Sequence, residues 1–249
     1  MSASNSLYTA LAGLNTFNTA ISVASNDIAN ANTTGFKSSS VDFGQLVSGL
    51  TASTTTCSGT DFTAGTAIQT GIWSDLMIQG NGFFAVENPT SSLVSYTQDG
   101  SFQLNSTGFL VDANGNEVLD DKGKAIQVAT PGDYTSFAVD QFGNLTGTNS
   151  SGTPTPLGVI GITTFANQNG LISTGQNDFI PGANVGTTTT QAAGSGNAGT
   201  IASGSLEGSN VDLTQEMVNL IDYQNDYQAC SKAITADSGN LQAAVNLIR

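Results

Sequence analysis

Residues 213–248 read LTQEMVNLIDYQNDYQACSKAITADSGNLQAAVNLI, and this C-terminal stretch decides the fold. Its apolar side chains recur largely in heptads, at Leu213, Met217, Leu220, Tyr227, Ile234, Leu241, Val245 and Ile248. A seven-residue apolar repeat over three or more heptads predicts a helix that packs along its length against other helices. Asp212 precedes the stretch and can cap the helix, with Gln215 three positions further on.

The N-terminal region carries the same kind of pattern and predicts a second long helix, from about residue 4 to residue 30. Its apolar heptad positions are Leu7, Leu11, Leu14, Ile21 and Ile28. Asp27 is the only charged side chain in residues 1–36. A helix that faces water normally carries charges opposite its apolar stripe. We therefore expect this helix to be surrounded by protein.

The sequence between the two helices is typical of β-structure. Short apolar runs at residues 76–78, 83–86 and 126–128 are separated by turn signals such as Asp99-Gly100 and Asn114-Gly115. The predicted fold class is α+β, with the terminal helices paired as a coiled-coil-like unit and a central, mostly antiparallel β-domain.

Three regions follow from these patterns. Residues 1–32 and 208–249 are expected to form a helical assembly domain, and residues 33–67 a Ser/Thr/Gly-rich extended linker. Residues 68–207 are expected to form the β-rich domain, which ends in a flexible Thr/Gly/Ala stretch at residues 186–204.

Composition excludes several classes of function. Charged residues make up 10% of the 249 residues, and the net charge of −14 argues against nucleic acid and anionic membranes as partners. The chain contains no histidine, which removes the commonest general base and metal ligand. No apolar run approaches the roughly 18 residues of a membrane span, and no cleavable signal peptide is evident.

None of the candidate chemical sites in the sequence predicts an enzyme. Asp112, Asn114 and Asn116, with Asp120 and Asp121, partly resemble a calcium loop, but Glu117 stands where an EF-hand requires glycine, so hairpin turns are preferred. Cys57 and Cys230 show no metal-ligand spacing, and we interpret them as incidental thiols, with a disulfide between them as the alternative. We predict no catalytic residue, no metal site and no cofactor.

The heptad stripes have two interpretations, the core of a helical hairpin within one chain or an interface between subunits. Four or five buried Leu or Ile side chains per helix contribute on the order of 10 kcal/mol. Ordering about 28 residues costs about 1–2 kcal/mol each, so a single two-helix seam is weakly stable. This favours burial against neighbouring subunits. We hypothesise that the termini are frayed or disordered in the monomer and fold on assembly.

Specific motifs at both ends and in the middle resemble the bacterial flagellar axial proteins, the rod and hook subunits. The matching segments are residues 10–14 (ALAGL), 25–37 (SNDIANANTTGFK), 75–84 (DLMIQGNGFF), 96–100 (YTQDG), 204–213 (GSLEGSNVDL), 227–229 (YQA) and 246–247 (NL). The length is similar to that of rod proteins, whereas the short linker and the entry to the C-terminal helix resemble the hook.

The resemblance implies a structural subunit that polymerises into a helical tube, transmits torque and encloses the export channel. The partners implied are copies of itself, neighbouring axial proteins and the flagellar type III export apparatus. The implied location is the basal body or hook, after export across the inner membrane. The heptad residues of both helices are then the expected subunit interface.

Two other classes remain alternatives at this point. A secreted β-rich adhesin or binding protein would also be acidic and rich in Thr and Gly, but it would not need long heptad helices at both ends. A secreted hydrolase would need a convergent polar site, and the sequence offers no such group of residues.

Overall fold

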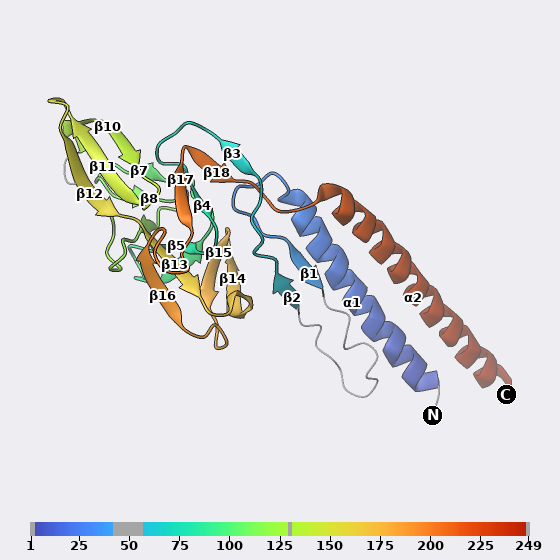
Figure 1. Ribbon diagram of the computed structural model, residues 1–249. Helices are drawn as coiled ribbons and strands as arrows, with labels where there is room; N and C mark the ends of the chain where they lie inside the picture. Colours follow the sequence, from blue (N-terminus) through green and yellow to red (C-terminus); the bar gives the residue numbers. More distant parts are fainter. Residues whose placement is uncertain (1–2, 42–56, 129–130, 248–249) are drawn as a thin grey trace. The chain divides into compact units, whose positions relative to one another are not determined.

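A computed structural model describes residues 3–41, 57–128 and 131–247, which form two compact units (Figure 1). The helical unit comprises residues 1–31, 38–61 and 211–249, and the β unit comprises residues 32–37 and 62–210. Outside the described part of the chain lie residues 42–56 of the expected linker, Ile248 and the Cys57 side chain.

The helical unit contains two long helices, α1 (Ala3–Ala29) and α2 (Leu213–Leu247), which lie side by side and antiparallel (Figure 1). A short antiparallel pair of strands, β1 (Ser39–Val41) and β2 (Cys57–Thr60), accompanies α1. The two helices expected from the heptad patterns are therefore present.

Asp212 begins α2 as the sequence predicts. Its Oδ1 accepts the backbone N–H groups of Thr214 at 2.9 Å and Gln215 at 3.2 Å. These are donors that the first turn of a helix leaves without partners, so the predicted cap is confirmed. The Gln215 side chain does not close a capping box but donates to the Asn219 side chain at 3.0 Å.

The β unit consists of antiparallel strands arranged in several sheets. The largest sheet has the order β14-β15-β6-β5-β9-β8-β7, with β13 joining β5 to β16, and β10, β11 and β12 form a separate sheet. Two further pairs are β17 with β4 and β18 with β3. The strands are β3 (Ala67–Gln69), β4 (Leu76–Gln79), β5 (Phe83–Glu87), β6 (Val94–Thr97), β7 (Gln103–Leu104), β8 (Leu110–Val111), β9 (Glu117–Val118), β10 (Tyr134–Val139), β11 (Asn144–Asn149), β12 (Pro154–Val159), β13 (Gly161–Phe165), β14 (Leu171–Gly175), β15 (Asp178–Pro181), β16 (Thr188–Ala192), β17 (Thr200–Ser203) and β18 (Ser205–Glu207). Two 3₁₀ turns complete the unit, η1 (Pro131–Asp133) and η2 (Gln168–Gly170).

The pairing explains two departures from the expected element pattern. Parts of the Thr/Gly/Ala stretch form strands, because residues 188–192 form β16 against β13 and residues 200–203 form β17 against β4. Threonine favours strands, since its branched side chain packs well on a pleated surface. The run at 126–128 forms no strand, and Gln127 makes an isolated bridge with Phe109.

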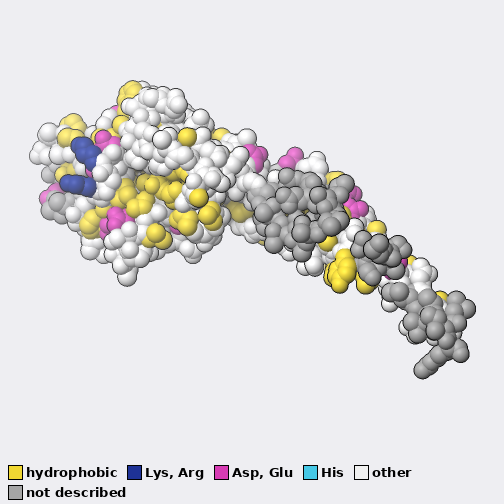
Figure 2. All heavy atoms as spheres, turned by 90° about the horizontal axis from the view of Figure 1, so that it is seen from below, with side chains coloured by type: hydrophobic (Ala, Val, Ile, Leu, Met, Phe, Trp, Pro, Cys, Tyr) yellow, Lys and Arg dark blue, Asp and Glu magenta, His cyan; other side chains and the backbone are white. Residues whose placement is uncertain are grey.

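Two apolar clusters hold the β unit together. The larger one gathers residues such as Phe84, Val86 and Ile162, which are fully buried. The smaller one is aromatic, with Phe83, Phe165 and Phe179 meeting in edge-on contacts. Uncharged polar groups and backbone make up most of the surface that Figure 2 shows.

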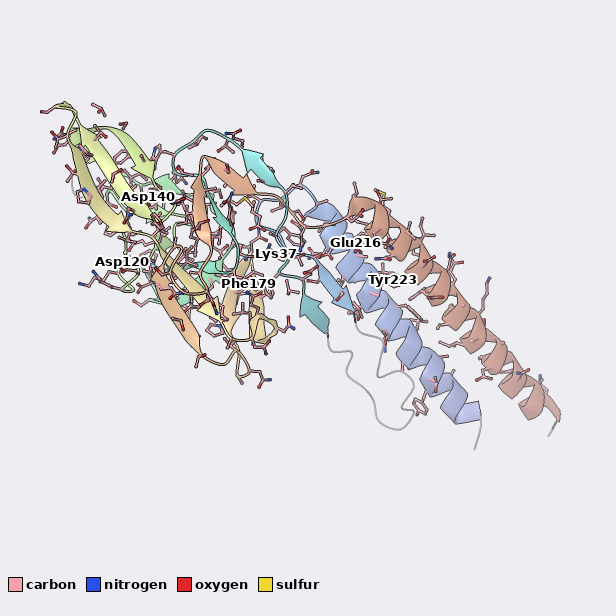
Figure 3. All side chains as sticks on the ribbon, viewed as in Figure 1. Lys37, Asp120, Asp140, Phe179, Glu216 and Tyr223 are labelled. Carbon is pink, nitrogen blue, oxygen red and sulfur yellow. The ribbon has the colours of Figure 1, made fainter. Side chains whose placement is uncertain are left out.

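Five hairpin loops of the β unit share one sequence pattern, Asp or Asn followed three residues later by glycine. In each loop the first residue's Oδ1 accepts backbone N–H groups two and four positions on, at 2.7–3.1 Å. The glycines have φ between +76° and +84°, a region that other residues rarely adopt. The loops begin at Asn105, Asp112, Asp120, Asp140 and Asn149, and Figure 3 labels Asp120 and Asp140. The preference for hairpin turns over a calcium loop at Asp112 is confirmed.

Candidate functional site

The most buried face of α1 is lined by small residues. Gly13, Thr16, Ala20, Ala24 and Asp27 are all buried and follow one another at spacings of three or four residues. Small side chains allow another backbone to approach closely. The predicted interface residues lie beside this face: Leu7, Leu14, Ile21 and Ile28 are half-buried, and Leu11 is exposed.

The half-buried face of α2 follows a regular alternation of four and three residues. Its members are Glu216, Leu220, Tyr223, Tyr227, Cys230, Ile234 and Asp237. Leu220, Tyr227 and Ile234 belong to the predicted heptad series, whereas Tyr223 and the acidic residues do not. The predicted residues Leu241 and Val245 lie on α2, but their side chains are outside the described part of the chain.

An exposed apolar stripe marks the first turns of α2. Leu213, Met217 and Ile221 are spaced four residues apart on one helix face, Val218 lies next to them, and Ile221 is 58% exposed. Tyr8 of α1 is also largely exposed. Contiguous exposed apolar surface of this kind marks an interaction site in a soluble protein. Leu213 and Met217, both predicted interface residues, are therefore available to a partner.

Asp27 is a fully buried carboxylate that attaches β1 to α1. Its Oδ2 accepts the Ser39 backbone N–H at 2.9 Å, and its Oδ1 has no hydrogen-bond partner among the described residues. Burial raises the pKa of Asp27 to about 6, the Ser39 hydrogen bond opposes that rise, and the charge of Glu216 adds to it.

A cavity of about 50 Å³ lies in the helical unit, lined by residues that include Ala20, Ala24, Ser39, Glu216 and Tyr223. Figure 3 labels Glu216 and Tyr223 on α2. Burial and the charges of Glu216 and Asp222 raise the pKa of Tyr223. This volume holds a few water molecules and no larger ligand.

A buried ion pair joins distant parts of the β unit. Lys37 Nζ lies 2.7 Å from Glu207 Oε1, and the two side chains are 0% and 2% exposed. Each charge has a second partner, because Lys37 donates to the Thr63 carbonyl at 2.9 Å and Glu207 accepts the Gly65 N–H at 2.8 Å. Figure 3 labels Lys37.

The backbone around the ion pair is closely packed. The Gly35 N–H donates to the Glu207 carbonyl at 2.8 Å. Gly35 has φ +64°, and a Cβ there would lie 2.6 Å from the Asp99 backbone. Only glycine fits this position. The Asn177 side chain donates to the Thr34 carbonyl at 2.9 Å.

Sequence reasoning identified neither the ion pair nor Asp27 as site residues. A signal was present, since each is a charged side chain within a stretch that otherwise carries few charges. An isolated charge in such a segment is typically neutralised by a specific partner. The partner of Lys37 lies 170 positions away, so no local pattern reveals it.

The described residues contain no group of three or more Cys, Asp or Glu side chains placed to hold a metal ion. None of the described helices is long and apolar enough to cross a membrane. The features described above are exposed apolar surface on α2 and buried polar junctions.

Comparison with known families identifies the class of protein. Residues 7–37 match the family described as "Flagella basal body rod protein", residues 77–147 "Flagellar hook protein FlgE/F/G D1 domain", and residues 202–247 "Flagellar basal body rod FlgEFG protein C-terminal". Together these matches define a flagellar axial protein.

Full-length relatives agree with the family matches. The chain is 38% identical to the flagellar basal-body rod protein FlgG of Bacillus subtilis (strain 168), with 98% of this chain and 99% of that protein covered. It is 31% identical to FlgG of Borreliella burgdorferi, with 98% of each covered. The flagellar hook protein FlgE of Escherichia coli (strain K12) is 38% identical over 117 residues, 47% of this chain and 29% of the hook protein.

The chain belongs to the flagellar rod and hook protein family. It is a structural subunit of the flagellar axial structure and not an enzyme. The comparisons give no support to the alternative of a secreted adhesin.

Proposed function

We propose that this chain is a rod subunit of the FlgG type that polymerises side by side with copies of itself into a helical tube. The observation that carries the proposal is the exposed apolar stripe formed by Leu213, Met217, Val218 and Ile221. The full-length relatives named above are rod proteins, whereas the hook protein matches over 29% of its length.

In the proposed polymer the terminal helices pair as a coiled-coil-like unit and form the inner tube around the export channel. The alternating spacing of half-buried residues on α2 supports such pairing, since a seam of this spacing stays on one side of a helix. The β unit forms the outer layer. Contacts between subunits are then heterologous, which generates a helix rather than a closed ring.

The remaining partners are neighbouring axial proteins and the flagellar type III export apparatus, which carries the chain across the inner membrane. The net charge of −14 supports the absence of nucleic acid among the partners. The helices gain part of their order from neighbouring subunits, and the exposed apolar side chains of α2 are surface that such neighbours would cover.

Polymerisation of purified full-length chain tests the proposal. The probe is Met217→Asp, which places a charge in the exposed stripe, and the matched control is Asn240→Asp, at an exposed polar position of the same helix that lies away from the stripe. Sedimentation and electron microscopy should show filaments for the original chain and the control, and none for Met217→Asp. If the original chain forms no filaments alone or with cell-derived axial components, the proposal is wrong.

A further inference from the structure

Three segments of the β unit continue directly in sequence into the helical unit. Residues 32–37 follow α1, residues 62–66 follow β2, and residues 207–210 precede α2. We call them the junction segments. In an assembled subunit, these segments are the covalent connections along which force on the helices can reach the β unit.

The Lys37–Glu207 ion pair connects all three junction segments. Lys37 belongs to the first and Glu207 to the third, while the Thr63 carbonyl and the Gly65 N–H, which complete the pair's hydrogen bonds, belong to the second. Asn210 adds a further connection, since its side chain donates to the Thr63 carbonyl at 3.2 Å.

The electrostatics make this connection specific. Both charges are buried, so breaking the pair would leave an uncompensated charge in a medium where it is very unfavourable. Two apolar side chains of similar size could fill the same space. However, they could not hold the Thr63 carbonyl or the Gly65 N–H, and the second segment would lose its attachment.

The neighbouring hairpin shows a second attachment. Gln176 and Asn177 both adopt positive φ, +56° and +63°, as the two central residues of a two-residue type I′ hairpin turn between β14 and β15 require. In this conformation the Asn177 side chain donates to the Thr34 carbonyl at 2.9 Å. This hydrogen bond attaches the hairpin to the first junction segment.

We propose that Lys37 and Glu207 are positioning residues that fix the junction segments, so that load on the helices of a polymerised subunit is carried into the β unit. The inference rests on the proposed polymer, but the ion pair's effect on the segments can be measured on the monomer. The proposal assigns the pair a role in the transmission of force that is separate from the stability of the β core.

The test uses full-length chain with Lys37→Met and Glu207→Met together, which removes both charges while keeping side-chain volume. The matched control is Lys122→Met with Glu117→Met, which removes one lysine and one glutamate elsewhere in the β unit. Amide hydrogen exchange is measured in the monomer, at Gly35 and Gly65 and in core strands β5 and β13.

We expect protection at Gly35 and Gly65 to fall about tenfold in the double variant, with β5 and β13 unchanged. Its filaments should still form but break at lower shear than those of the original chain and the control. In cells, variant filaments should support little swimming.

Unchanged protection at Gly35 and Gly65 would overturn the proposal, as would lost protection combined with filaments of normal shear resistance. Loss of protection throughout β5 and β13 would also overturn it, because the pair would then maintain the fold itself. Failure of the original chain to polymerise is a separate result, which would refute the proposed function.

Discussion

The helical unit and the β unit bury opposite kinds of side chain. On α1 the buried face consists mainly of small residues such as Ala20 and Ala24, and several large apolar residues of α2 are exposed. In the β unit, large side chains such as Phe84 and Ile162 are fully buried. The β unit therefore has a core of large apolar side chains, whereas the described part of the helical unit buries mainly small ones and leaves large apolar side chains of α2 exposed.

The strongest test of this contrast is Phe84→Ala. Phe84 is fully buried and meets Phe102 edge-on at 5.0 Å between ring centroids. Removing a buried Phe side chain costs about 3–5 kcal/mol. We expect the β unit to lose about that much stability, measured by urea unfolding followed through Trp73 fluorescence. The helical signal at 222 nm should change little, and a parallel loss of helix would contradict the independence of the two units.

Leu220→Asp tests the helical unit. Leu220 is half-buried on the α2 face, so a charge there should destabilise helix packing by about 2 kcal/mol. We expect the variant to abolish incorporation into filaments while Phe84 and the β core remain packed. Swimming is measured in a strain whose only copy carries the substitution, with Asn240→Asp as the control. Normal motility would contradict the assignment of this α2 face to subunit assembly.

The sequence predicted the two units unequally. Periodicity located both helices, because heptads of Leu and Ile are visible without any partner. Periodicity did not indicate the buried face of α1, since Gly13, Ala20 and Ala24 are small and carry little hydrophobic signal. Turn chemistry predicted the hairpin at Asn114-Gly115, because an Asx side chain and a glycine act within a few residues.

Contacts between residues far apart in the chain could not be predicted from the sequence. The partner of Lys37 is one of four glutamates, and nothing local distinguishes Glu207 from the others. Only the folded β unit brings residues 170 positions apart to 2.7 Å. The exposure of Leu213 and Met217 likewise depends on how α2 packs, and not on its heptads.

Each unit contains a buried carboxyl whose pKa is raised, and these two groups extend the comparison. Burial raises the pKa of Asp27 in the helical unit to about 6. In the β unit, burial and the charges of Asp112 and Asp99 raise the pKa of Asp178 to about 6, against a hydrogen bond with Ser95. The folded state of each unit therefore binds a proton more tightly than the unfolded chain, whose Asp pKa is near 4.

The resulting stability is fully present below about pH 4 and is lost as the pH rises through about 6. Asp27→Asn keeps an acceptor for the Ser39 N–H and removes the charge. We expect it to stabilise the helical unit by about 2 kcal/mol at pH 7.5 and to abolish its gain on acidification. Thermal unfolding at 222 nm between pH 4 and 7.5 measures this. Asp178→Asn is the counterpart in the β unit and should leave the helical pH profile unchanged.

The prediction with the smallest expected effect concerns the hairpin loops. It separates the loss of a hydrogen-bond acceptor from the loss of a negative charge. Asp140 Oδ1 accepts the N–H groups of Phe142 and Asn144, both at 2.9 Å. Partial burial raises the pKa of Asp140, but its hydrogen bonds with Phe142, Gly143 and Asn144 outweigh that effect and hold the pKa below its usual value. Asp140→Ala removes the acceptor and should cost the β unit about 1 kcal/mol.

Asp140→Asn is the informative control, because Asn105 and Asn149 hold the same loop position elsewhere in the β unit. An asparagine keeps the acceptor and loses the charge. At pH 7.5 it should therefore cost clearly less than alanine. As the pH falls through the lowered pKa of Asp140, Asp140→Asn and the original chain should become more alike. Urea unfolding of the two variants and the original chain at pH 7.5 and below measures the difference. Equal losses for Asn and Ala at pH 7.5 would mean that the negative charge, and not the hydrogen-bonded turn, stabilises these loops.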